Sequence, residues 1–276
     1  MTLLQLFVLA LVQGITEFLP ISSSAHLVLI PELTGWQDQG LAIDVAVHLG
    51  TLGAVVLYFR HDLARMAVGA WRLVTGQGDR NAHLALKVVV ASLPVIGAGF
   101  AVNALMGEGR NLFLLANIIA VASIVFGLLL WWVDRRAAAD RRAETLGYAE
   151  AVLIGCAQAL ALIPGTSRSG ITMTAARWLR LTRTEAARFS LLLAIPAILG
   201  AGVLKGAEVV AAGDVALGRD ALVAAALSFV SALGAIFLMM KWLERASFAP
   251  FVVYRVVLGL ALLAYLHFGL DTAAGG

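Results

Sequence analysis

The chain has 276 residues, of which 61% are hydrophobic and 13% are charged. Soluble domains are about 45–50% apolar and about 25% charged, so this composition indicates an integral membrane protein. The net charge of +3 is expected to come from basic loops, and we expect no nucleic acid partner. The single cysteine, Cys156, excludes an intrachain disulfide and a cysteine metal cluster.

Six stretches are long and apolar enough to cross a bilayer as helices, which takes about 20 residues. The loop at 134–148 is the most charged of the polar segments between them, and we expect it to be a solvated stop-transfer loop. The predicted fold is an all-α polytopic membrane protein, with residues 1–276 forming a single membrane domain. The six predicted spans lie at about 41–59, 85–105, 112–133, 186–204, 221–243 and 251–268.

Two further apolar regions, at 2–33 and 149–181, are each interrupted midway by a proline, Pro20 and Pro164. Each half is too short to cross a hydrocarbon core of about 30 Å at about 1.5 Å per residue. Short, proline-interrupted segments are typical of re-entrant or broken helices at a binding site. We therefore expect two re-entrant helical hairpins beside the six spans.

The two interrupted regions resemble each other. The first contains LVQGITEFLPISSSAH and the second contains GCAQALALIPGTSRSG, and in each a glutamine precedes an aliphatic–proline pair that hydroxyl residues follow. The prolines are about 144 residues apart. This indicates an internal duplication, with pseudo-repeats at about 1–133 and 149–268 joined by the basic loop 134–148.

The distribution of lysine and arginine orients this arrangement. If each hairpin enters and leaves on one side, sixteen basic residues fall on one side of the membrane, three fall on the other, and Arg168 lies in the second break. Because basic loops stay inside, the first side is expected to be cytoplasmic. The hairpins then enter from opposite faces as an inverted-topology repeat, their tips meet near the midplane, and both termini lie outside.

The second break, PGTSRSG at 164–170, has the composition of a phosphate site. A tip at membrane depth must be buried in protein or line a polar cavity, and the helix that it begins favours an anion at its N-terminus. Arg168 is a permanently charged fork suited to phosphate, and it would be costly in an apolar phase without an anionic partner. Helix capping by the hydroxyls is the alternative, but it leaves Arg168 unexplained. The other residues expected to line the site are Gly165, Thr166, Ser167, Ser169 and Gly170.

The first break brings together groups that activate nucleophiles. Gln13 and Glu17 are four apart and share a face of one helix, and Ser23 and His26 are three apart and share a face of the next. A serine with an imidazole in reach is the minimum for nucleophilic catalysis, with His26 as general base or acid. Glu17 could orient the imidazole, bind a metal ion or relay a proton. A histidine satisfied in the interior and serines used for capping are the alternatives.

The motif pair QGITEFLPISSSAH and PGTSRSG resembles the undecaprenyl-diphosphate phosphatase family of the bacitracin-resistance type. The resemblance covers essentially the whole chain in length, segment count and motif order. It implies an inverted-repeat membrane fold in the bacterial cytoplasmic membrane, and hydrolysis of the C55 polyprenyl diphosphate lipid to the monophosphate at the outer, periplasmic face. That reaction recycles the lipid carrier of peptidoglycan synthesis. The resemblance also implies a divalent cation, Mg²⁺ or Ca²⁺.

The resemblance also assigns roles by position. Gln13 stands where the family has glutamate or glutamine, so Glu17 is expected to carry the acid chemistry alone and to be the tentative metal ligand. Ser22 and Ser24 match positions that line the site. The implied catalytic residues are Glu17, Ser23, His26 and Arg168.

The expected mechanism places the diphosphate at Arg168 and the two helix N-termini. Ser23 attacks the terminal phosphorus with His26 as base, while Glu17 orients His26 or helps to bind Mg²⁺. Attack by His26 itself, or by water that His26 activates, is left open. A homodimer is also left open.

Three other residues carry weaker expectations. Asp44 and His48, four apart on the next helix, form either a second polar layer behind the site or a packing pair. Arg255, beside Tyr254, is expected to extend toward the cytoplasmic interface rather than into the site.

The main alternative function is a secondary transporter or flippase of a polyprenyl phosphate lipid, because broken helices in inverted repeats also bind anionic substrates in transporters. A transporter needs an anion site but no nucleophile. The serine and histidine beside Arg168 therefore favour the enzyme. A structural or assembly protein would explain neither break.

Overall fold

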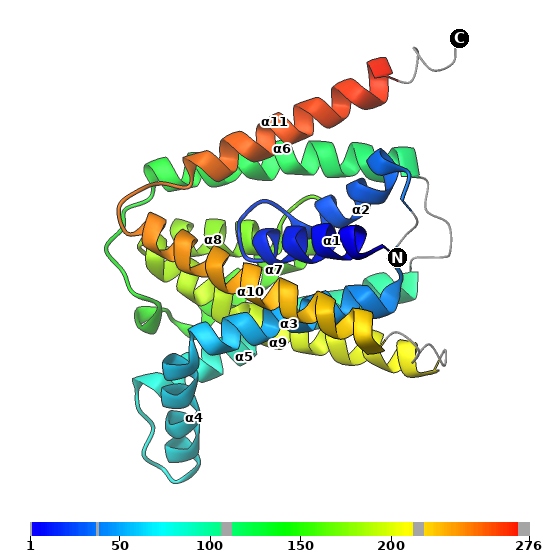
Figure 1. The fold of residues 1–276 in the computed structure, drawn as a ribbon. Coiled ribbons are helices and arrows are strands. Elements are labelled where there is room, and N and C mark those ends of the chain that lie inside the picture. The colour runs from blue at the N-terminus through cyan, green and yellow to red at the C-terminus, as the bar shows by residue number, and fades with distance from the viewer. Residues whose placement is uncertain (1, 37–38, 106–111, 212–217, 270–276) are drawn as a thin grey trace, which may run out of the picture.

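The computed structural model describes residues 2–36, 39–105, 112–211 and 218–269, and its regular elements are helices (Figure 1). Six helices in these residues are long and apolar enough to span a membrane, and each coincides with one of the six predicted spans. The predicted all-α polytopic fold is therefore confirmed. The spans are Leu41–Tyr58, Arg80–Val102, Phe113–Arg136, Arg183–Val209, Gly218–Leu243 and Ala249–Phe268.

The elements follow one another in two similar series, each of which begins with a pair of short helices. In chain order they are α1 (Leu3–Thr16), α2 (Ser23–Thr34), α3 (Leu41–Tyr58), α4 (Arg60–Val74), α5 (Arg80–Leu105), α6 (Leu112–Arg136), η1 (Ala143–Thr145), α7 (Tyr148–Ala159), η2 (Leu160–Leu162), α8 (Arg168–Trp178), α9 (Arg183–Ala211), α10 (Gly218–Leu243), α11 (Ala249–Ala264) and the π-helical turn η4 (Tyr265–Gly269).

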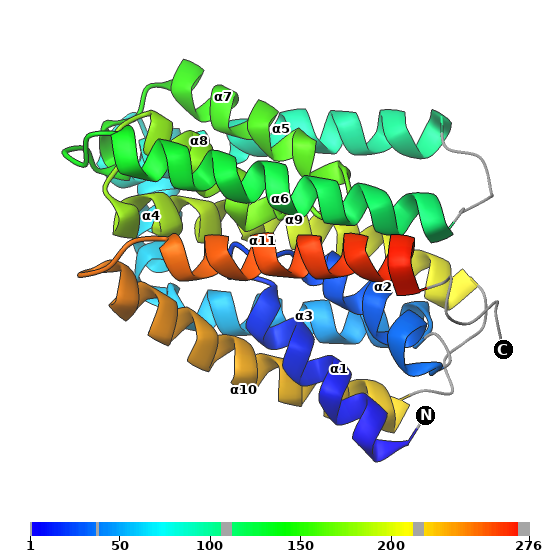
Figure 2. The same cartoon turned by 90° about the horizontal axis from the view of Figure 1, so that it is seen from above.

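The short helices pack between the longer ones, with one face of α1 and one face of α7 exposed. In Figure 1, α6 and α11 lie side by side along one face, and α3, α5, α9 and α10 lie along the opposite face. The pairs α1–α2 and α7–α8 lie between these two groups, and the view from above in Figure 2 separates them to opposite sides of α11. Helix α1 packs on α10 and α7 packs on α5. The first break is thus surrounded by protein, whereas the second is exposed at Leu162 and Ile163 and buried from Gly165 to Ser167.

The two breaks have the same backbone geometry. Pro20 and Pro164 have no N–H to donate to a helix, so the chain leaves the helical path near each of them. A new helix then begins after a serine with positive φ, Ser22 (φ 71°, ψ 90°) in one break and Ser167 (φ 69°, ψ 110°) in the other. These serines are 145 positions apart, one more than the two prolines. The pseudo-repeat boundaries and the re-entrant path through a membrane remain predictions.

Positive φ is unusual for serine and costs about 1–3 kcal/mol, so the surroundings must hold it. In each break the serine hydroxyl pairs with the hydroxyl two residues later. The oxygens are 3.3 Å apart for Ser22 and Ser24, and 3.2 Å apart for Ser167 and Ser169. The equivalent hydroxyl pairs explain why both motifs are rich in serine at the same spacing.

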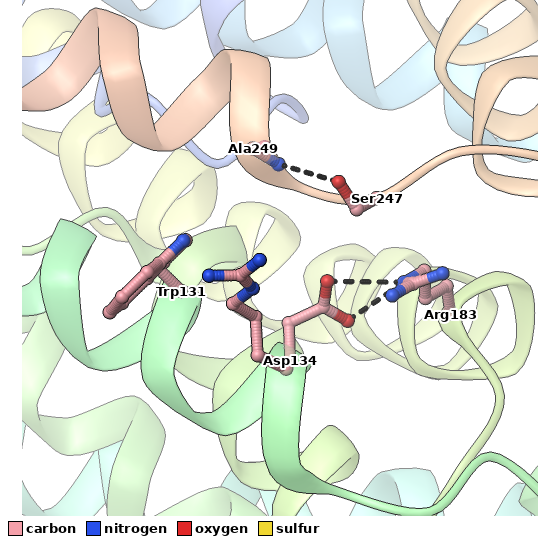
Figure 3. Close-up of a pocket in the computed structure, with 6 residues that line it drawn as sticks. Trp131, Asp134, Arg183, Ser247 and Ala249 are labelled. Carbon is pink, nitrogen blue, oxygen red and sulfur yellow. Dashed lines mark hydrogen bonds and ion pairs between the residues drawn. The ribbon is translucent and has the colours of Figure 1, made fainter.

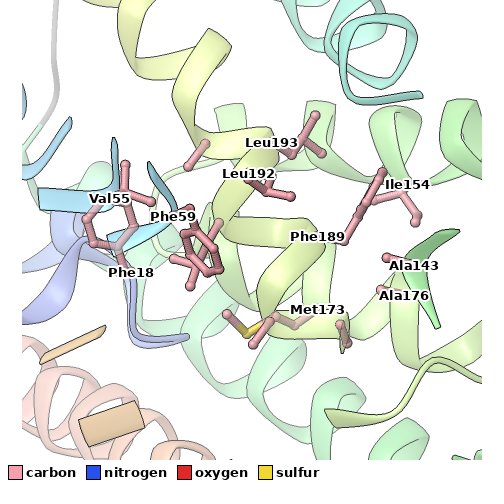
Figure 4. Close-up of a cluster of buried hydrophobic side chains, with 14 of the residues drawn as sticks. Phe18, Val55, Phe59, Ala143, Ile154, Met173, Ala176, Phe189, Leu192 and Leu193 are labelled. Carbon is pink, nitrogen blue, oxygen red and sulfur yellow. The ribbon is translucent and has the colours of Figure 1, made fainter. Parts of the chain in front are cut away.

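The apolar core anchors both breaks to the bundle. Phe18, just before the first break, and Met173, in the helix after the second, are both fully buried. They belong to one cluster with Val55, Phe59 and Phe189 of the flanking spans (Figure 4). Burying a side chain of this size contributes about 1.5–3 kcal/mol, so packing fixes the chain at the start of the first break and in the helix after the second.

The basic loop at 134–148 is exposed along most of its length, as predicted, but part of it docks on the bundle. Asp134 is buried and pairs with Arg177 and Arg183, while Glu144 pairs with Arg188. Residues Ala143–Thr145 form a 3₁₀ turn, and Arg141 forms an isolated bridge with Leu181. The loop docks because α8 and α9 present arginines that compensate its carboxylates, which a reading of its composition alone could not include.

Candidate active site

Glu17 is the centre of a hydrogen-bonded cluster at the two breaks. Its Oε1 accepts from Nη2 of Arg168 at 2.8 Å. Its Oε2 accepts from Nε2 of Gln13 at 2.8 Å and from Oγ of Ser23 at 2.7 Å. Glu17 is only 7% exposed, and a buried carboxylate requires a counter-ion and several donors. The cluster supplies both, so the predicted residues Gln13, Glu17, Ser23 and Arg168 are brought together.

The local folds explain this convergence. Gln13 precedes Glu17 by one turn of α1, and the break then turns the chain so that Ser23, at the start of α2, lies opposite Glu17. Arg168 is the first residue of α8. Ser23 and Arg168 therefore occupy equivalent positions, each directly after the positive-φ serine of its break, and both donate to the same carboxylate.

A second contact joins the two breaks. The hydroxyl of Ser169 donates to the backbone oxygen of Leu19 at 2.8 Å. Ser169 is 3% exposed and Leu19 directly precedes Pro20, so this bond ties the start of α8 to the bend of the first break. Together with the ion pair between Arg168 and Glu17, it places the two helix N-termini against one site.

The second break combines capping with unpaired polar groups. Ser167 caps α8 by accepting from the N–H of Gly170 at 3.2 Å, so the capping alternative is correct for this residue. Thr166 is fully buried, and its hydroxyl has no partner in the described part of the chain. Gly165 has φ 88°, and a Cβ there would lie 2.5 Å from the carbonyl oxygen of Ile119. The break thus requires glycine at this position.

His26 has partners other than those predicted. Its Nδ1 lies 2.7 Å from the carbonyl oxygen of Ser22, and its Nε2 lies 2.5 Å from the hydroxyl of Tyr254. A carbonyl only accepts, so Nδ1 carries the proton and in the neutral ring Nε2 accepts from Tyr254. No hydrogen bond joins Ser23 to His26 among the described contacts, so the role of His26 as base for Ser23 stays a prediction. Ser23 turns toward Glu17, and the imidazole bonds back to the carbonyl four residues earlier.

His48 approaches the same carboxylate from α3. Its Nε2 lies 3.8 Å from Oε2 of Glu17, and its Nδ1 contacts the carbonyl oxygen of Asp44 at 2.7 Å. The carboxylate of Asp44 instead accepts from Gln39 at 2.8 Å. Of the two readings left open, His48 fits a polar layer behind Glu17, and Asp44 contributes only its backbone.

Arg255 is a further site residue that the sequence argument missed. It is fully buried, so the prediction that it extends to the interface is wrong. Its Nη2 donates to the carbonyl oxygens of Thr166 at 2.8 Å and Gly165 at 3.0 Å, which the break leaves without helix partners. Gly170 leaves the space for this guanidinium, since a Cβ there would lie 2.8 Å from Nη1. The signal was available, because an arginine inside a predicted span needs buried acceptors.

Tyr254 and Arg255 connect both breaks to one helix. Tyr254 bonds the imidazole of the first break, and its neighbour Arg255 bonds the carbonyls of the second. Nε and Nη1 of Arg255 have no partner among the described residues. A buried cation with unsatisfied donors beside a phosphate-type loop adds positive charge to the site.

An apolar cavity of about 390 Å³ lies beside the second break. Its lining is almost wholly apolar, formed by six residues of α6 between Asn117 and Phe126 and by Ile163, which directly precedes Pro164. The carbonyl of Ala122, one of these lining residues, also accepts from Arg255 at 3.4 Å. An open apolar groove therefore lies beside the second break, next to the carbonyl that Arg255 contacts.

Comparison with known proteins identifies the family. The family described as bacitracin resistance protein BacA matches residues 6–261. The chain belongs to this family. The undecaprenyl-diphosphatases of Jannaschia sp. (strain CCS1) and Ruegeria pomeroyi are 51% and 50% identical to it, each over 270 residues, which are 97% of this chain and all of each relative. The undecaprenyl-diphosphatase 1 of Rhodospirillum rubrum is 49% identical over 279 residues, covering 99% of this chain and 98% of the relative.

The predicted resemblance is thus confirmed, and every residue of the cluster lies within the match to the bacitracin resistance protein family. The divalent cation that the resemblance implies can be tested against the donors present. No group of three metal-ligating side chains occurs in the described ranges. Glu17 is the carboxylate of the cluster, and the buried Oε1 of Gln13 beside it has no partner there. These two oxygens fit a cation that is shared with substrate phosphate oxygens.

Proposed function

We propose that this chain is an undecaprenyl-diphosphate phosphatase that converts undecaprenyl diphosphate to undecaprenyl phosphate and inorganic phosphate. The reaction recycles the lipid carrier of peptidoglycan synthesis and confers bacitracin resistance. The observation that carries the proposal is the meeting of Ser23 and Arg168, each the first side chain of a helix, on the carboxylate of Glu17. The names of relatives that are about half identical over nearly the whole chain support it.

The diphosphate is held by Arg168 and by the N-termini of α2 and α8. Only one terminal nitrogen of Arg168 is engaged by Glu17 in the described chain, so its other N–H groups are available to phosphate. Ser167, Ser169 and the backbone at Gly165 and Thr166 line the same place. The apolar cavity beside Ile163 takes the adjoining part of the isoprenoid chain. A polar head site next to an apolar cavity matches an amphiphilic lipid.

Glu17, rather than His26, is the base that the geometry supports. The Ser23 hydroxyl already donates to Oε2 of Glu17 at 2.7 Å, which is the distance for proton transfer. Ser23 attacks the terminal phosphorus, its proton passes to Glu17, and the bond to the bridging oxygen breaks to release undecaprenyl phosphate. Water then attacks the phosphoserine, and inorganic phosphate leaves as Ser23 regains a proton. Arg168 stabilises the charge that develops on the phosphoryl oxygens.

His26 has a positioning role in this scheme. Its bond to the carbonyl of Ser22 holds the residue before Ser23 in its positive-φ conformation, and its bond to Tyr254 fixes the ring. When bound, Mg²⁺ or Ca²⁺ supplies charge neutralisation for the diphosphate. Glu17 and Oε1 of Gln13 are the residues that would hold it.

The proposed orientation puts the site open to the outer face, with both hairpins re-entrant and both termini outside. The distribution of lysine and arginine supports it, and so does the direct contact between the two breaks. The localisation is the bacterial cytoplasmic membrane, where the six apolar helices span the bilayer.

The test is release of inorganic phosphate from a polyprenyl diphosphate by the purified chain in detergent with Mg²⁺ or Ca²⁺. We expect Arg168→Ala to lower turnover by about 100-fold or more, since it removes a preorganised charge, while Arg245→Ala, at an exposed position beyond α10, leaves turnover unchanged. A transporter of polyprenyl phosphate would bind lipid but release no phosphate. Absence of release from the folded protein would overturn the proposal.

A further inference from the structure

A second cavity, of about 370 Å³ and with charged residues in its lining, lies at the end of the bundle where α6 ends and α11 begins (Figure 3). It is separate from the Glu17 cluster. Helix α8 runs from the Glu17 cluster toward the cavity. Its first residue is Arg168, and Arg177 lies about 14 Å further along its axis, where it pairs with Asp134 of the cavity. The lining residues are Trp131, Asp134, Arg135, Arg183, Ser247 and Ala249.

The cavity has an excess of positive charge. Asp134 is 4% exposed, and its carboxylate accepts from Nε of Arg177 at 3.0 Å and from Nε of Arg183 at 2.9 Å. It also accepts from the N–H of Phe248 at 3.5 Å. The cavity is lined by two guanidinium groups, those of Arg135 and Arg183, and by one carboxylate, which Arg177 also pairs with from outside the lining. The resulting excess of positive charge favours an anion.

Two of these arginines keep donors for a ligand. Arg177 directs its terminal nitrogens to the carbonyl oxygens of Ala137, Ala138 and Leu181, so it is fully used by the protein. Arg183 uses only Nε on Asp134, and in the described ranges its two terminal nitrogens have no acceptor. Arg135 stacks over Trp131 at 5.2 Å and forms no ion pair there. Two planar forks with open N–H groups are suited to bidentate phosphate binding.

The aromatic residues place the cavity at a membrane boundary. Trp131 and Trp132 lie at the end of the candidate span Phe113–Arg136 and are 40% and 37% exposed. Tryptophan and arginine together at the end of a span are typical of the headgroup region. In Figure 3 the indole nitrogen of Trp131 is on the cavity side of its ring, where it adds a donor. The cavity is therefore within reach of a lipid headgroup.

We propose that this cavity binds the phosphate group of an anionic phospholipid between Arg135 and Arg183. Basic pockets between spans are a known type of lipid headgroup site. Free inorganic phosphate offers the same chemistry, so the experiment must distinguish the two sources. The proposal uses no residue of the Glu17 cluster and does not depend on the reaction.

The test is native mass spectrometry of the full chain, released from detergent after titration with phosphatidylglycerol, phosphatidylcholine or inorganic phosphate. The variant is Arg135→Gln, because Arg135 is exposed and its loss leaves the pairing of Asp134 intact. Arg136→Gln is the matched control, since Arg136 stacks on Trp132 at the same 5.2 Å but does not line the cavity. Arg183→Lys keeps a cation beside Asp134 while removing the fork.

We expect one saturable phosphatidylglycerol per chain, with affinity lowered about tenfold by Arg135→Gln and by Arg183→Lys and unchanged by Arg136→Gln. Phosphatidylcholine should bind more weakly. Saturable binding of inorganic phosphate alone, with the same dependence on Arg135, would support the site and assign free phosphate as its source. Equal effects of the Arg135 and Arg136 variants, or no saturable binding of either phosphate source, would overturn the proposal.

Discussion

Arg168 and Glu17 are 151 positions apart in the chain, and their side chains meet in an ion pair of 2.8 Å between the two breaks. The pair has two consequences for an anionic substrate. Alone, Glu17 would repel a diphosphate, and alone, Arg168 would be an uncompensated charge at membrane depth. As an ion pair, they are neutral overall. The pair keeps a carboxylate beside Ser23 and leaves a guanidinium group for the substrate phosphate.

The first prediction concerns Glu17→Gln. The amide keeps the shape of the side chain but cannot take the proton of Ser23, so we expect kcat to fall by about 100-fold or more. The comparison is made on kcat at saturating substrate and saturating Mg²⁺, because the amide is also a weaker ligand for the cation than the carboxylate. The measurement is phosphate release over a range of substrate concentrations. Glu208→Gln, at an exposed position on α9, is the control for loss of a carboxylate, and a kcat within about threefold of wild type would exclude Glu17 as the base.

The second prediction separates the serines of the first break. Ser23→Ala should lower turnover by at least about 1,000-fold, since it removes the proposed nucleophile, and acid-quenched wild type should yield a peptide phosphorylated at Ser23. Ser24→Ala is the matched control, because its hydroxyl contacts Ser22 rather than Glu17. If Ser23→Ala retains most of the turnover and no phosphopeptide forms, Ser23 is excluded as the nucleophile in favour of His26 or water.

The sequence predicted the elements of this site better than their contacts. The six spans, both breaks and the gathering of Gln13, Glu17, Ser23 and Arg168 follow from apolar length, proline positions and helical spacing. Which hydroxyl faces which partner depends on how α2 is rotated against α1, and local spacing carries no such information. For this reason the sequence did not indicate that Ser23 bonds Glu17 and that His26 bonds the carbonyl of Ser22.

Arg255 was missed for a different reason. Its acceptors are carbonyls at 165 and 166, about 90 positions earlier, and they become accessible only because the second break interrupts a helix. In the sequence, Arg255 is an arginine beside a tyrosine near a helix end, and such side chains commonly extend to the membrane interface. Similarly, the loop at 134–148 has carboxylates whose arginine partners are on α8 and α9. In both cases, contacts with residues far away in the sequence determine where the charged side chains lie.

The third prediction tests the contact between His26 and Tyr254. Tyr254→Phe keeps the ring, which stacks on the imidazole with centroids 5.7 Å apart, but removes the hydroxyl. Loss of one hydrogen bond corresponds to about 1 kcal/mol, so we expect kcat to fall about fivefold. In His26→Asn, kcat should fall further. The kcat of the double variant should be no lower than that of His26→Asn alone, because both substitutions remove the same hydrogen bond. Fully additive losses would show that the two residues act independently.

The fourth prediction concerns the backbone of the second break. Gly165→Ala introduces a Cβ at φ 88°, 2.5 Å from the carbonyl oxygen of Ile119 and 2.7 Å from its Cα. We expect destabilisation of about 2 kcal/mol or more and loss of activity, because the break must shift and Arg255 loses its acceptors. Gly97→Ala, in an open position of α5, should change the melting temperature little. Equal melting temperatures for the two variants would contradict the required positive φ.

The fifth prediction concerns Arg188, which holds the charged loop to α9. Its guanidinium contacts Asp62 at 2.8 Å, Glu144 at 2.6 Å and Glu185 at 3.3 Å. Without it, three carboxylates face one another, so we expect Arg188→Gln to cost about 3 kcal/mol and to lower the melting temperature in detergent. Arg65→Gln is the control, because Arg65 also contacts Asp62 at 2.9 Å but its side chain is 64% exposed.

The melting temperatures of wild type and of Arg188→Gln should respond differently to a fall in pH. Burial raises the pKa of Glu144, but the hydrogen bond and the charge of Arg188, together with a backbone hydrogen bond and the charge of Arg142, hold this pKa below its ordinary value. The contact therefore stabilises the folded wild type at neutral pH, and this contribution is lost as the pH falls below about 4.5 and through the lowered pKa. In Arg188→Gln, protonation relieves repulsion among the three carboxylates. Its melting temperature should therefore fall less than that of wild type between pH 7 and pH 4, or rise, and a parallel fall in both would show that Arg188 does not set the charge balance of this loop.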